Sequence, residues 1–175
     1  GKVEVTDKDG KTAVHEARHI IIATGARSTA MPRLQIDHKK VIGYREALVL
    51  DTQPKSMIIV GSGAIGSEFA YFYNSIGTKV TIVEFLPRIV PVEDEEISKE
   101  LEKVYKKKGI DILTSSEVTS VDTSGDGVRA KVQTKDGETT LEADVVLSAV
   151  GIVANIENIG LEDLSVKTER GKIVV

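Results

Sequence analysis

The sequence predicts an α/β fold in which a parallel β-sheet is followed by an antiparallel β-meander. An uncharged apolar run, 57–60, enters a glycine-rich turn, and a helical segment separates it from a second apolar run, 80–83. A third strand is predicted at 110–113, after another helical segment, and strands that alternate with helices indicate a parallel sheet. Beyond these runs, turn signals at 125–127 and 136–137 divide the chain into the short strands of a meander.

Composition narrows the possible functions. The chain has 175 residues, of which 41% are hydrophobic and 29% charged, as in an ordinary globular protein. A net charge of -4 argues against a nucleic-acid partner, and no apolar run approaches the length that spans a membrane. Cysteine is absent, which excludes disulfides and thiolate metal sites from these residues. The first residues lack a signal-peptide layout, as expected of a cytoplasmic protein.

The glycine-rich turn has the spacing Gly-x-Gly-x-x-Gly at Gly61, Gly63 and Gly66. Gly61 permits a tight turn out of the strand, and Gly63 lets a pyrophosphate approach the backbone. Gly66 lets the following helix pack close to the strand, and the start of that helix offers N–H groups and a positive dipole end to phosphates. Together with its flanking strand and helix, the turn predicts a Rossmann-type dinucleotide site. The alternative is a structural turn that binds no ligand.

A carboxylate closes the second strand of this unit. Glu84 lies 18 residues after Gly66, where it can accept hydrogen bonds from the adenosine ribose. Because a carboxylate repels a 2′-phosphate, Glu84 favours NAD over NADP.

Two helices are predicted to cover the sheet. The first carries apolar residues at helical spacing and ends at Gly77; its expected buried face is Ile65, Phe69, Phe72 and Ile76. The second spans about 94–108 and has an acidic start and a basic end, which suits the helix dipole. Its expected buried stripe is Ile97, Leu101 and Val104, and Glu95–Lys99 and Glu102–Lys106 are expected ion pairs.

The first 25 residues read as a hairpin followed by a buried strand. Alternating residues at 2–6 and 12–14 flank an Asp9-Gly10 turn, and an apolar run ends in glycine at 19–25. Residues 26–56 read as a connector with a short helix at 44–48. A further strand is expected to begin at Lys172.

This arrangement occurs twice. Residues 16–25 align without gaps to 142–151, and both segments follow an Asp-Gly hairpin. The second copy ends a dinucleotide fold that begins at Met57. The first copy therefore predicts that residues 1–25 are the last part of another dinucleotide domain; the alternative is chance similarity of two short segments.

Several motifs together carry a family resemblance: Ile22–Gly25, Val60–Ala70, Val80–Glu84 and Ala149–Gly151. In this order they resemble the flavoprotein disulfide reductases, and most closely the dihydrolipoamide dehydrogenases. The resemblance implies three parts: residues 1–50 as the edge of an FAD domain plus a connector, 51–155 as an NAD-binding domain, and 156–175 as a segment returning toward the FAD domain.

The resemblance also implies an activity and partners. The parent would be a homodimeric enzyme that reoxidises dihydrolipoamide through a disulfide and FAD to NAD, serving the lipoyl domains of 2-oxo acid dehydrogenase complexes. Its FAD and dimerisation domains, and its redox cysteines, would lie in the same chain outside these residues, so the isolated segment is expected to be inactive. Other NAD(P)H-dependent disulfide, mercuric or peroxide reductases, and a non-catalytic dinucleotide sensor, remain alternatives.

Carried over residue by residue, the resemblance implies the cofactor contacts. The pyrophosphate and nicotinamide would be lined by Gly61, Ser62, Gly63, Ala64, Ile65, Gly66, Ser67 and Glu68. Glu84 would hold the ribose, Val118 would lie against the adenine, and Gly151 near the nicotinamide. FAD would be contacted by Ala23, Thr24 and Gly25. Ile152 stands where the family often has a basic residue. No catalytic residue is expected here, and the spacing of His15, His19 and His38 predicts no metal site.

Overall fold

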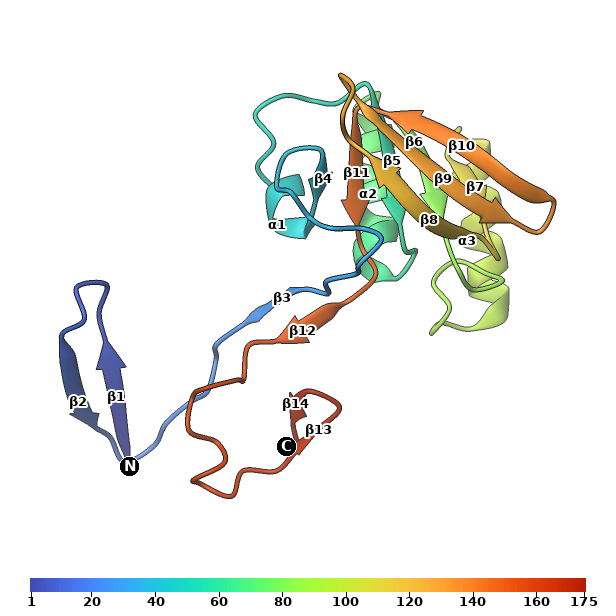
Figure 1. Ribbon diagram of the computed structural model, residues 1–175. Helices are drawn as coiled ribbons and strands as arrows, with labels where there is room; N and C mark the ends of the chain where they lie inside the picture. Colours follow the sequence, from blue (N-terminus) through green and yellow to red (C-terminus); the bar gives the residue numbers. More distant parts are fainter. The chain divides into compact units, whose positions relative to one another are not determined.

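The computed structural model describes all 175 residues, which form two compact units. One unit comprises residues 1–26 and 154–175, and the other comprises residues 27–153. The elements run from β1 to β14 with three helices (Figure 1).

The larger unit is built on a five-stranded parallel sheet in the order β4-β11-β5-β6-β7. Its strands are β4 (Val41–Ile42), β11 (Val145–Ser148), β5 (Ser56–Val60), β6 (Lys79–Val83) and β7 (Asp111–Leu113). The predicted parallel sheet is thus confirmed, with β11 added on the far side of β5. The connector contributes β4, which was not expected as a strand.

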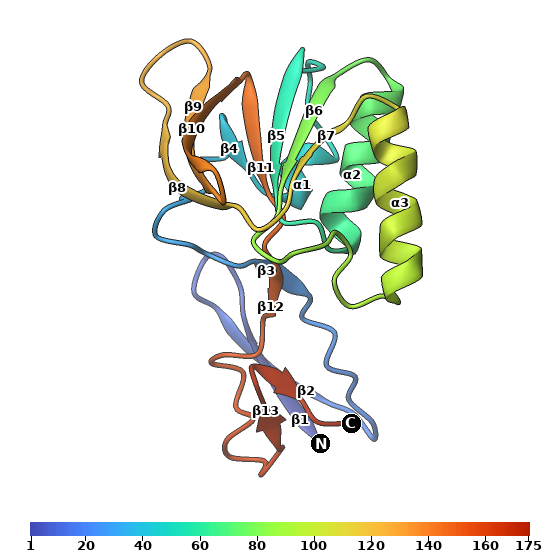
Figure 2. The same cartoon turned by 90° about the vertical axis from the view of Figure 1, so that its right-hand side faces the viewer.

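Helices cover one face of this sheet and the meander covers the other (Figure 2). The helices are α1 (Tyr44–Ala47), α2 (Ala64–Ser75) and α3 (Glu95–Lys107); the meander strands are β8 (Glu117–Asp122), β9 (Val128–Thr134) and β10 (Gly137–Ala143). Successive side chains of β5 point to opposite faces of the sheet. Met57 and Ile59 pack in the core on the helix side, whereas Ile58 and Val60 pack in the core on the meander side. A strand buried on both faces explains the uncharged run in the sequence.

The buried face of α2 differs from the predicted one. Ile65 and Phe69 pack against the core, but Phe72 and Ile76 are 53% and 45% exposed, so that half of the prediction is wrong. The residues that α2 buries are Gly66, Ser67, Ala70 and Tyr73. Apart from Tyr73 these residues are small, and small residues let the helix approach the sheet closely.

The buried stripe of α3 also differs. Leu101 packs against the core as predicted, but Ile97 is 59% and Val104 38% exposed. Ser98 and Tyr105 are buried instead, because their hydroxyl groups donate to the Val90 and Ser67 carbonyls at 3.3 and 2.9 Å. The predicted pairs Glu95–Lys99 and Glu102–Lys106 are present at 2.6 and 2.5 Å.

The smaller unit contains two hairpins. Strands β1 (Lys2–Thr6) and β2 (Thr12–Glu16) confirm the first predicted hairpin, and β13 (Thr168–Glu169) pairs with β14 (Lys172–Ile173), confirming a strand at Lys172. The predicted buried strand at 19–25 is wrong: these residues form no strand, and Ile21 is 89% exposed. An apolar strand is stabilised only between neighbouring strands, and no strand of the described chain pairs with this run.

Two short strands, β3 (Ala26–Ser28) and β12 (Ile152–Ala154), form a separate two-stranded sheet. None of the three helices combines the length and apolar character needed to cross a membrane.

Candidate dinucleotide-binding site

The candidate site lies at the carboxyl ends of β5, β6 and β11. The chain leaves β5 at the glycine turn, β6 at Glu84 and β11 in the segment leading to Gly151. The strand order places β6 on one side of β5 and β11 on the other, so β5 is at the point where the winding of the sheet reverses. Open α/β sheets bind ligands at such switch points, outside the carboxyl ends of the strands.

The three glycines of the turn have different surroundings. Gly61 has φ +95°, and a Cβ built there would lie 2.6 Å from the Ala149 carbonyl oxygen. A Cβ at Gly66 would lie 2.0 Å from the Gly61 oxygen. Both positions therefore require glycine: Gly61 for the turn, and Gly66 for the close packing of the helix. By contrast, a Cβ at Gly63 would meet no protein atom within 4 Å. The protein leaves space at the one glycine where a pyrophosphate is predicted to approach.

The start of α2 suits an anion. Its N-cap is Gly63, which has no side chain to accept from the N–H groups of the first turn. The start of α3 is different, because the Asp94 carboxylate accepts from the Glu96 and Ile97 N–H groups at 2.8 and 3.4 Å. An uncapped helix start beside open space favours a phosphate group.

Glu84 is held against the glycine turn. The residue is only 6% exposed, and its Oε2 accepts from the Ser62 backbone N at 2.8 Å and from the Ser62 Oγ at 2.6 Å. Its Oε1 accepts from the Leu86 N at 2.8 Å. The carboxylate therefore joins the end of β6 to the loop after β5.

Hydrogen bonds from buried hydroxyl groups hold the glycine turn and the start of α2 in place. The Ser62 carbonyl accepts from the Val90 N at 2.9 Å and from the Ser67 Oγ at 3.0 Å. The Tyr105 hydroxyl donates to the Ser67 carbonyl, and burial, with the nearby negative charge of Glu68, raises the pKa of Tyr105, which keeps this donor protonated. Sequence reasoning missed this support, since no motif links Tyr105 on α3 to the turn.

The other predicted NAD contacts lie around this core. Val118 is 5% exposed and packs in the meander-side core; it follows Ser116, whose N donates to the Glu84 carbonyl at 2.9 Å. Gly151 is exposed with φ +134°, and its carbonyl accepts from the Thr29 N at 2.9 Å. Glu68 and Ala64 are exposed on the first turns of α2. The structure thus gathers these residues in one unit.

The predicted FAD contacts belong to the smaller unit. The Thr24 Oγ1 donates to the Asn155 carbonyl at 2.5 Å, and the Asn155 Nδ2 donates to the Thr24 carbonyl at 3.1 Å. The Asn155 N donates to the Gly25 carbonyl at 2.9 Å. These bonds fasten Thr24 and Gly25 to a residue 130 or more positions away in sequence.

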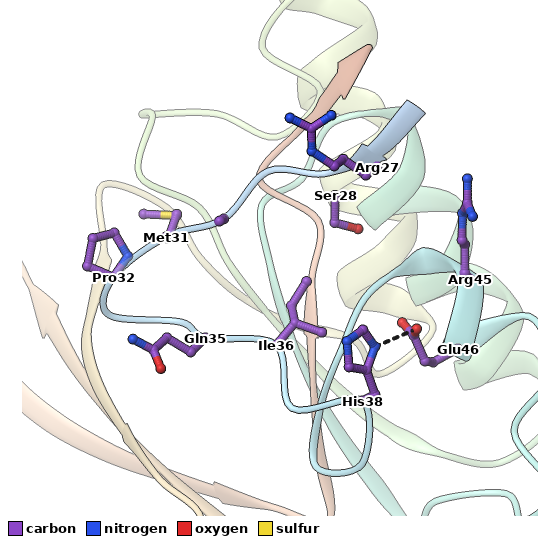
Figure 3. Close-up of a pocket in the computed structure, with 10 residues that line it drawn as sticks. Arg27, Ser28, Met31, Pro32, Gln35, Ile36, His38, Arg45 and Glu46 are labelled. Carbon is purple, nitrogen blue, oxygen red and sulfur yellow. Dashed lines mark hydrogen bonds and ion pairs between the residues drawn. The ribbon is translucent and has the colours of Figure 1, made fainter. Parts of the chain in front are cut away.

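A cavity of about 780 Å³ lies elsewhere in the larger unit (Figure 3). Its lining includes Met31, Ile36 and the ion pair of His38 with Glu46, whose Nδ1 and Oε1 are 2.8 Å apart. None of the predicted site residues lines it. The described chain has no group of three or more His, Asp or Glu residues placed to hold a metal ion.

Comparison with known proteins gives consistent matches. A family model described as pyridine nucleotide-disulphide oxidoreductase matches residues 1–175. Dihydrolipoyl dehydrogenase of Rhizobium etli is 51% identical over 161 residues, which cover 91% of this chain and 34% of that protein. The enzyme of the same name from Zymomonas mobilis is 44% identical over 174 residues, covering 99% of this chain and 37% of that protein. The chain thus spans about a third of the length of these relatives.

Solved structures of related proteins have the same fold as this chain. The crystal structure of LpdA from Mycobacterium tuberculosis superimposes with a TM-score of 0.82 at 33% identity, over 96% of this chain and 36% of that one. A ferredoxin reductase from Rhodopseudomonas palustris gives a TM-score of 0.78 at 27% identity, over 98% and 43% of the two chains.

Proposed function

The chain belongs to the pyridine nucleotide-disulphide oxidoreductase family, and from this premise we propose that residues 27–153 bind NAD within a dihydrolipoyl dehydrogenase. One observation carries the proposal. The open space at Gly63 lies beside a helix start without a side-chain cap, and the buried carboxylate of Glu84 accepts a hydrogen bond from the same turn. A phosphate and a ribose diol are the groups these features fit.

The residues divide the work of binding. The N–H groups at the start of α2 would receive the pyrophosphate, with Gly63 leaving the space for it. Glu84 would accept from the adenosine ribose, and Val118 and Gly151 would lie toward the adenine and the nicotinamide. The bound cofactor supplies hydride transfer, and the protein contributes binding and orientation.

The wider assignment rests on the relatives. Their shared name supports dehydrogenation of a dihydrolipoyl group. We propose that the whole enzyme uses FAD and NAD, and that it is a homodimer that serves the lipoyl domains of 2-oxo acid dehydrogenase complexes. Ala23, Thr24 and Gly25 would contact FAD. The isolated chain should bind NADH without turning over, since it has no cysteine to form a redox disulfide.

A titration of the chain with NADH tests the binding role of Glu84. Glu84→Ala should raise the Kd for NADH several-fold, because the ribose loses its acceptor. Glu142→Ala is the control, since the Glu142 carboxylate pairs with Arg129 on the exposed meander surface at 3.0 Å and should leave Kd unchanged. Unfolding of each variant is measured in parallel. Equal affinity of Glu84→Ala and the unaltered chain would refute the ribose role.

The substrate assignment needs a separate assay. The chain expressed with the segments that flank it in its gene should reduce NAD with dihydrolipoamide as electron donor. Activity confined to NADPH and a different disulfide, or to a peroxide or mercuric ion, would assign the protein to another reductase of the family.

A further inference from the structure

The carboxylate of Glu84 is already largely occupied by donors from the protein. A carboxylate offers about four acceptor positions, two on each oxygen. Oε2 accepts from the N and the Oγ of Ser62 at 2.8 and 2.6 Å, and Oε1 accepts from the Leu86 N at 2.8 Å. Three positions are therefore filled, and the remaining one is on Oε1.

A ribose diol has two O–H donors. If one donates to each carboxylate oxygen, the ribose needs a free acceptor position on Oε2 as well as the one on Oε1, and both positions of Oε2 are filled. Of the three protein donors, two are backbone N–H groups whose directions the fold fixes. The Ser62 hydroxyl is the only one that can turn away by rotation of a side chain. It is therefore the donor that a bidentate ribose would displace.

We propose that the Ser62 hydroxyl is an internal substitute for a ribose hydroxyl. It satisfies Glu84 while the site is empty and competes with the dinucleotide for the same oxygen. This inference rests on the proposed NAD-binding function. Ser62 therefore stabilises the unliganded protein and weakens dinucleotide binding, without itself being required for contact with the cofactor.

Burial makes this competition effective. Ser62 is 0% exposed and Glu84 6%, so water has little access to the oxygen that the hydroxyl occupies. Ser67, the other buried serine at the turn, donates to the Ser62 carbonyl and does not reach the carboxylate in this way. If the Ser62 hydroxyl is removed, Oε2 keeps the Ser62 N as a donor but has one acceptor position unfilled until a ligand provides a donor.

Ser62→Ala tests the proposal through two measurements of opposite sign. The thermal midpoint of the unliganded chain should fall by a few degrees, because a buried acceptor loses one of its two donors. The Kd for NADH should fall about threefold to tenfold, because the ribose no longer displaces a protein donor. A merely structural role would lower the midpoint and weaken binding together. Unchanged or weaker NADH binding by Ser62→Ala would overturn the proposal.

Two further variants make the test specific. Ser98→Ala removes a buried hydroxyl that donates to the Val90 carbonyl at 3.3 Å, away from the predicted cofactor contacts, and should lower the midpoint without tightening binding. Combined with Glu84→Ala, the Ser62→Ala substitution should no longer change the Kd for NADH; a tightening that persists there would also overturn the proposal. Should Ser62→Ala fail to fold, Ser62→Cys keeps a side chain of similar shape with a weaker donor, and tighter binding is again expected.

The outcomes separate the two proposals. Failure of the unaltered chain to bind NADH would refute the proposed function and this inference with it. Binding by the unaltered chain with no gain in Ser62→Ala would refute the inference alone.

Discussion

Gly63 and Gly66 are alike in sequence but differ in what surrounds them. Gly63 has φ -63°, which any residue adopts, and its missing Cβ borders open space; at Gly66 a Cβ would lie 2.0 Å from a backbone oxygen. Gly63→Ala should therefore fold with nearly unchanged stability but lose NADH affinity at least about tenfold, because the methyl group fills the space for the pyrophosphate.

Gly66→Ala should show the reverse defect: loss of folded protein or strong destabilisation, because backbone cannot yield by an ångström or more. Circular dichroism melting and NADH titration of both variants check the pair. An alanine at position 63 that leaves affinity intact would contradict the placement of the phosphate.

The buried hydroxyl group of Ser148 makes no hydrogen bond that would stabilise the fold. It is 2% exposed at the end of β11, and its Oγ has no hydrogen-bond partner. A buried unpaired hydroxyl costs free energy of desolvation, so Ser148→Ala should raise the free energy of unfolding by about 1 kcal/mol. Urea unfolding measures this. A loss of stability, with Ser75→Ala on the exposed side of α2 as control, would mean that the hydroxyl has a partner.

Single-residue reasoning from the sequence was most successful where a motif fixes geometry. The spacing of the glycines and the position of Glu84 after β6 predicted which segments meet. It could not predict that the Glu84 carboxylate binds the turn itself, since Ser62 enters the motif only as an unspecified residue between two glycines. Such a bond depends on side-chain direction, which spacing does not encode.

At the scale of elements, periodicity located the helices but not their buried faces. It predicted α3 within one residue at each end, yet it chose Ile97 and Val104 because they are apolar. The structure buries Ser98, which is small, and Tyr105, whose ring packs in the helix-side core. The hydroxyl groups of both residues donate to carbonyls. A pattern that counts only large apolar residues does not detect a helix packed through serine, glycine and tyrosine.

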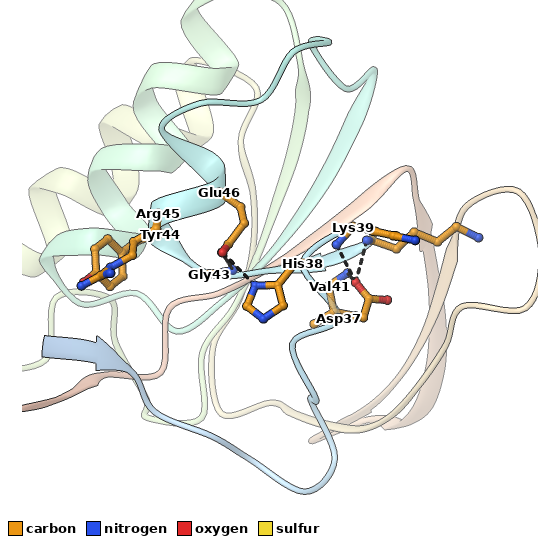
Figure 4. A network of polar contacts seen from close by, with 9 residues as sticks. Asp37, His38, Lys39, Val41, Gly43, Tyr44, Arg45 and Glu46 are labelled. Carbon is orange, nitrogen blue, oxygen red and sulfur yellow. Dashed lines mark hydrogen bonds and ion pairs between the residues drawn. The ribbon is translucent and has the colours of Figure 1, made fainter. Parts of the chain in front are cut away.

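The loop before β4 links stability to pH (Figure 4). One oxygen of Asp37 accepts from the N–H groups of Lys39, Lys40 and Val41 at 2.8, 2.8 and 2.9 Å. Burial alone raises the pKa of this carboxyl, but these bonds outweigh it and lower the pKa below its ordinary value. The stabilisation is therefore complete above the unfolded pKa near 4 and is lost as pH falls through the lower folded pKa.

Unfolding measured from pH 6 to about pH 2.5 should show this loss as a falling free energy of unfolding below about pH 4. Asp37→Asn cannot ionise, so its curve should be flatter over that range and lie below that of the unaltered chain at pH 6. Asp126→Asn, in an exposed loop of the meander, is the control. Identical slopes for Asp37→Asn and the unaltered chain would contradict the assignment. Glu46 contributes in the same direction: burial raises its pKa, but the bonds from His38 and the Gly43 N lower it overall.

At the scale of the whole molecule, both hydrophobic cores lie within one unit. Every buried residue of the helix-side and meander-side clusters falls between residues 27 and 153, whereas all ten residues of β1 and β2 are exposed. A chain of residues 27–153 should therefore unfold cooperatively, with a midpoint within a few degrees of the full chain, and bind NADH with the same Kd. Chemical unfolding and titration compare the two chains. A fragment that fails to fold would show that residues outside this range complete the core.

The sequence anticipated the architecture of this unit because each βα step carries its own local signals. It did not anticipate β4, since a two-residue strand in a connector has no periodicity to detect. Conversely, the apolar run at 19–25 has the composition of a buried strand, but composition cannot supply the neighbouring strands that such a run requires.

The bonds that fasten Glu84 also constrain any redesign of cofactor preference. Replacing the carboxylate with a small or basic residue to admit a 2′-phosphate would leave the N–H groups of Ser62 and Leu86 without an acceptor. These two donors come from loops that follow different strands. A successful NADP variant therefore has to provide new acceptors for both loops, so the exchange is a problem of rebuilding two loops together and not of changing one charge.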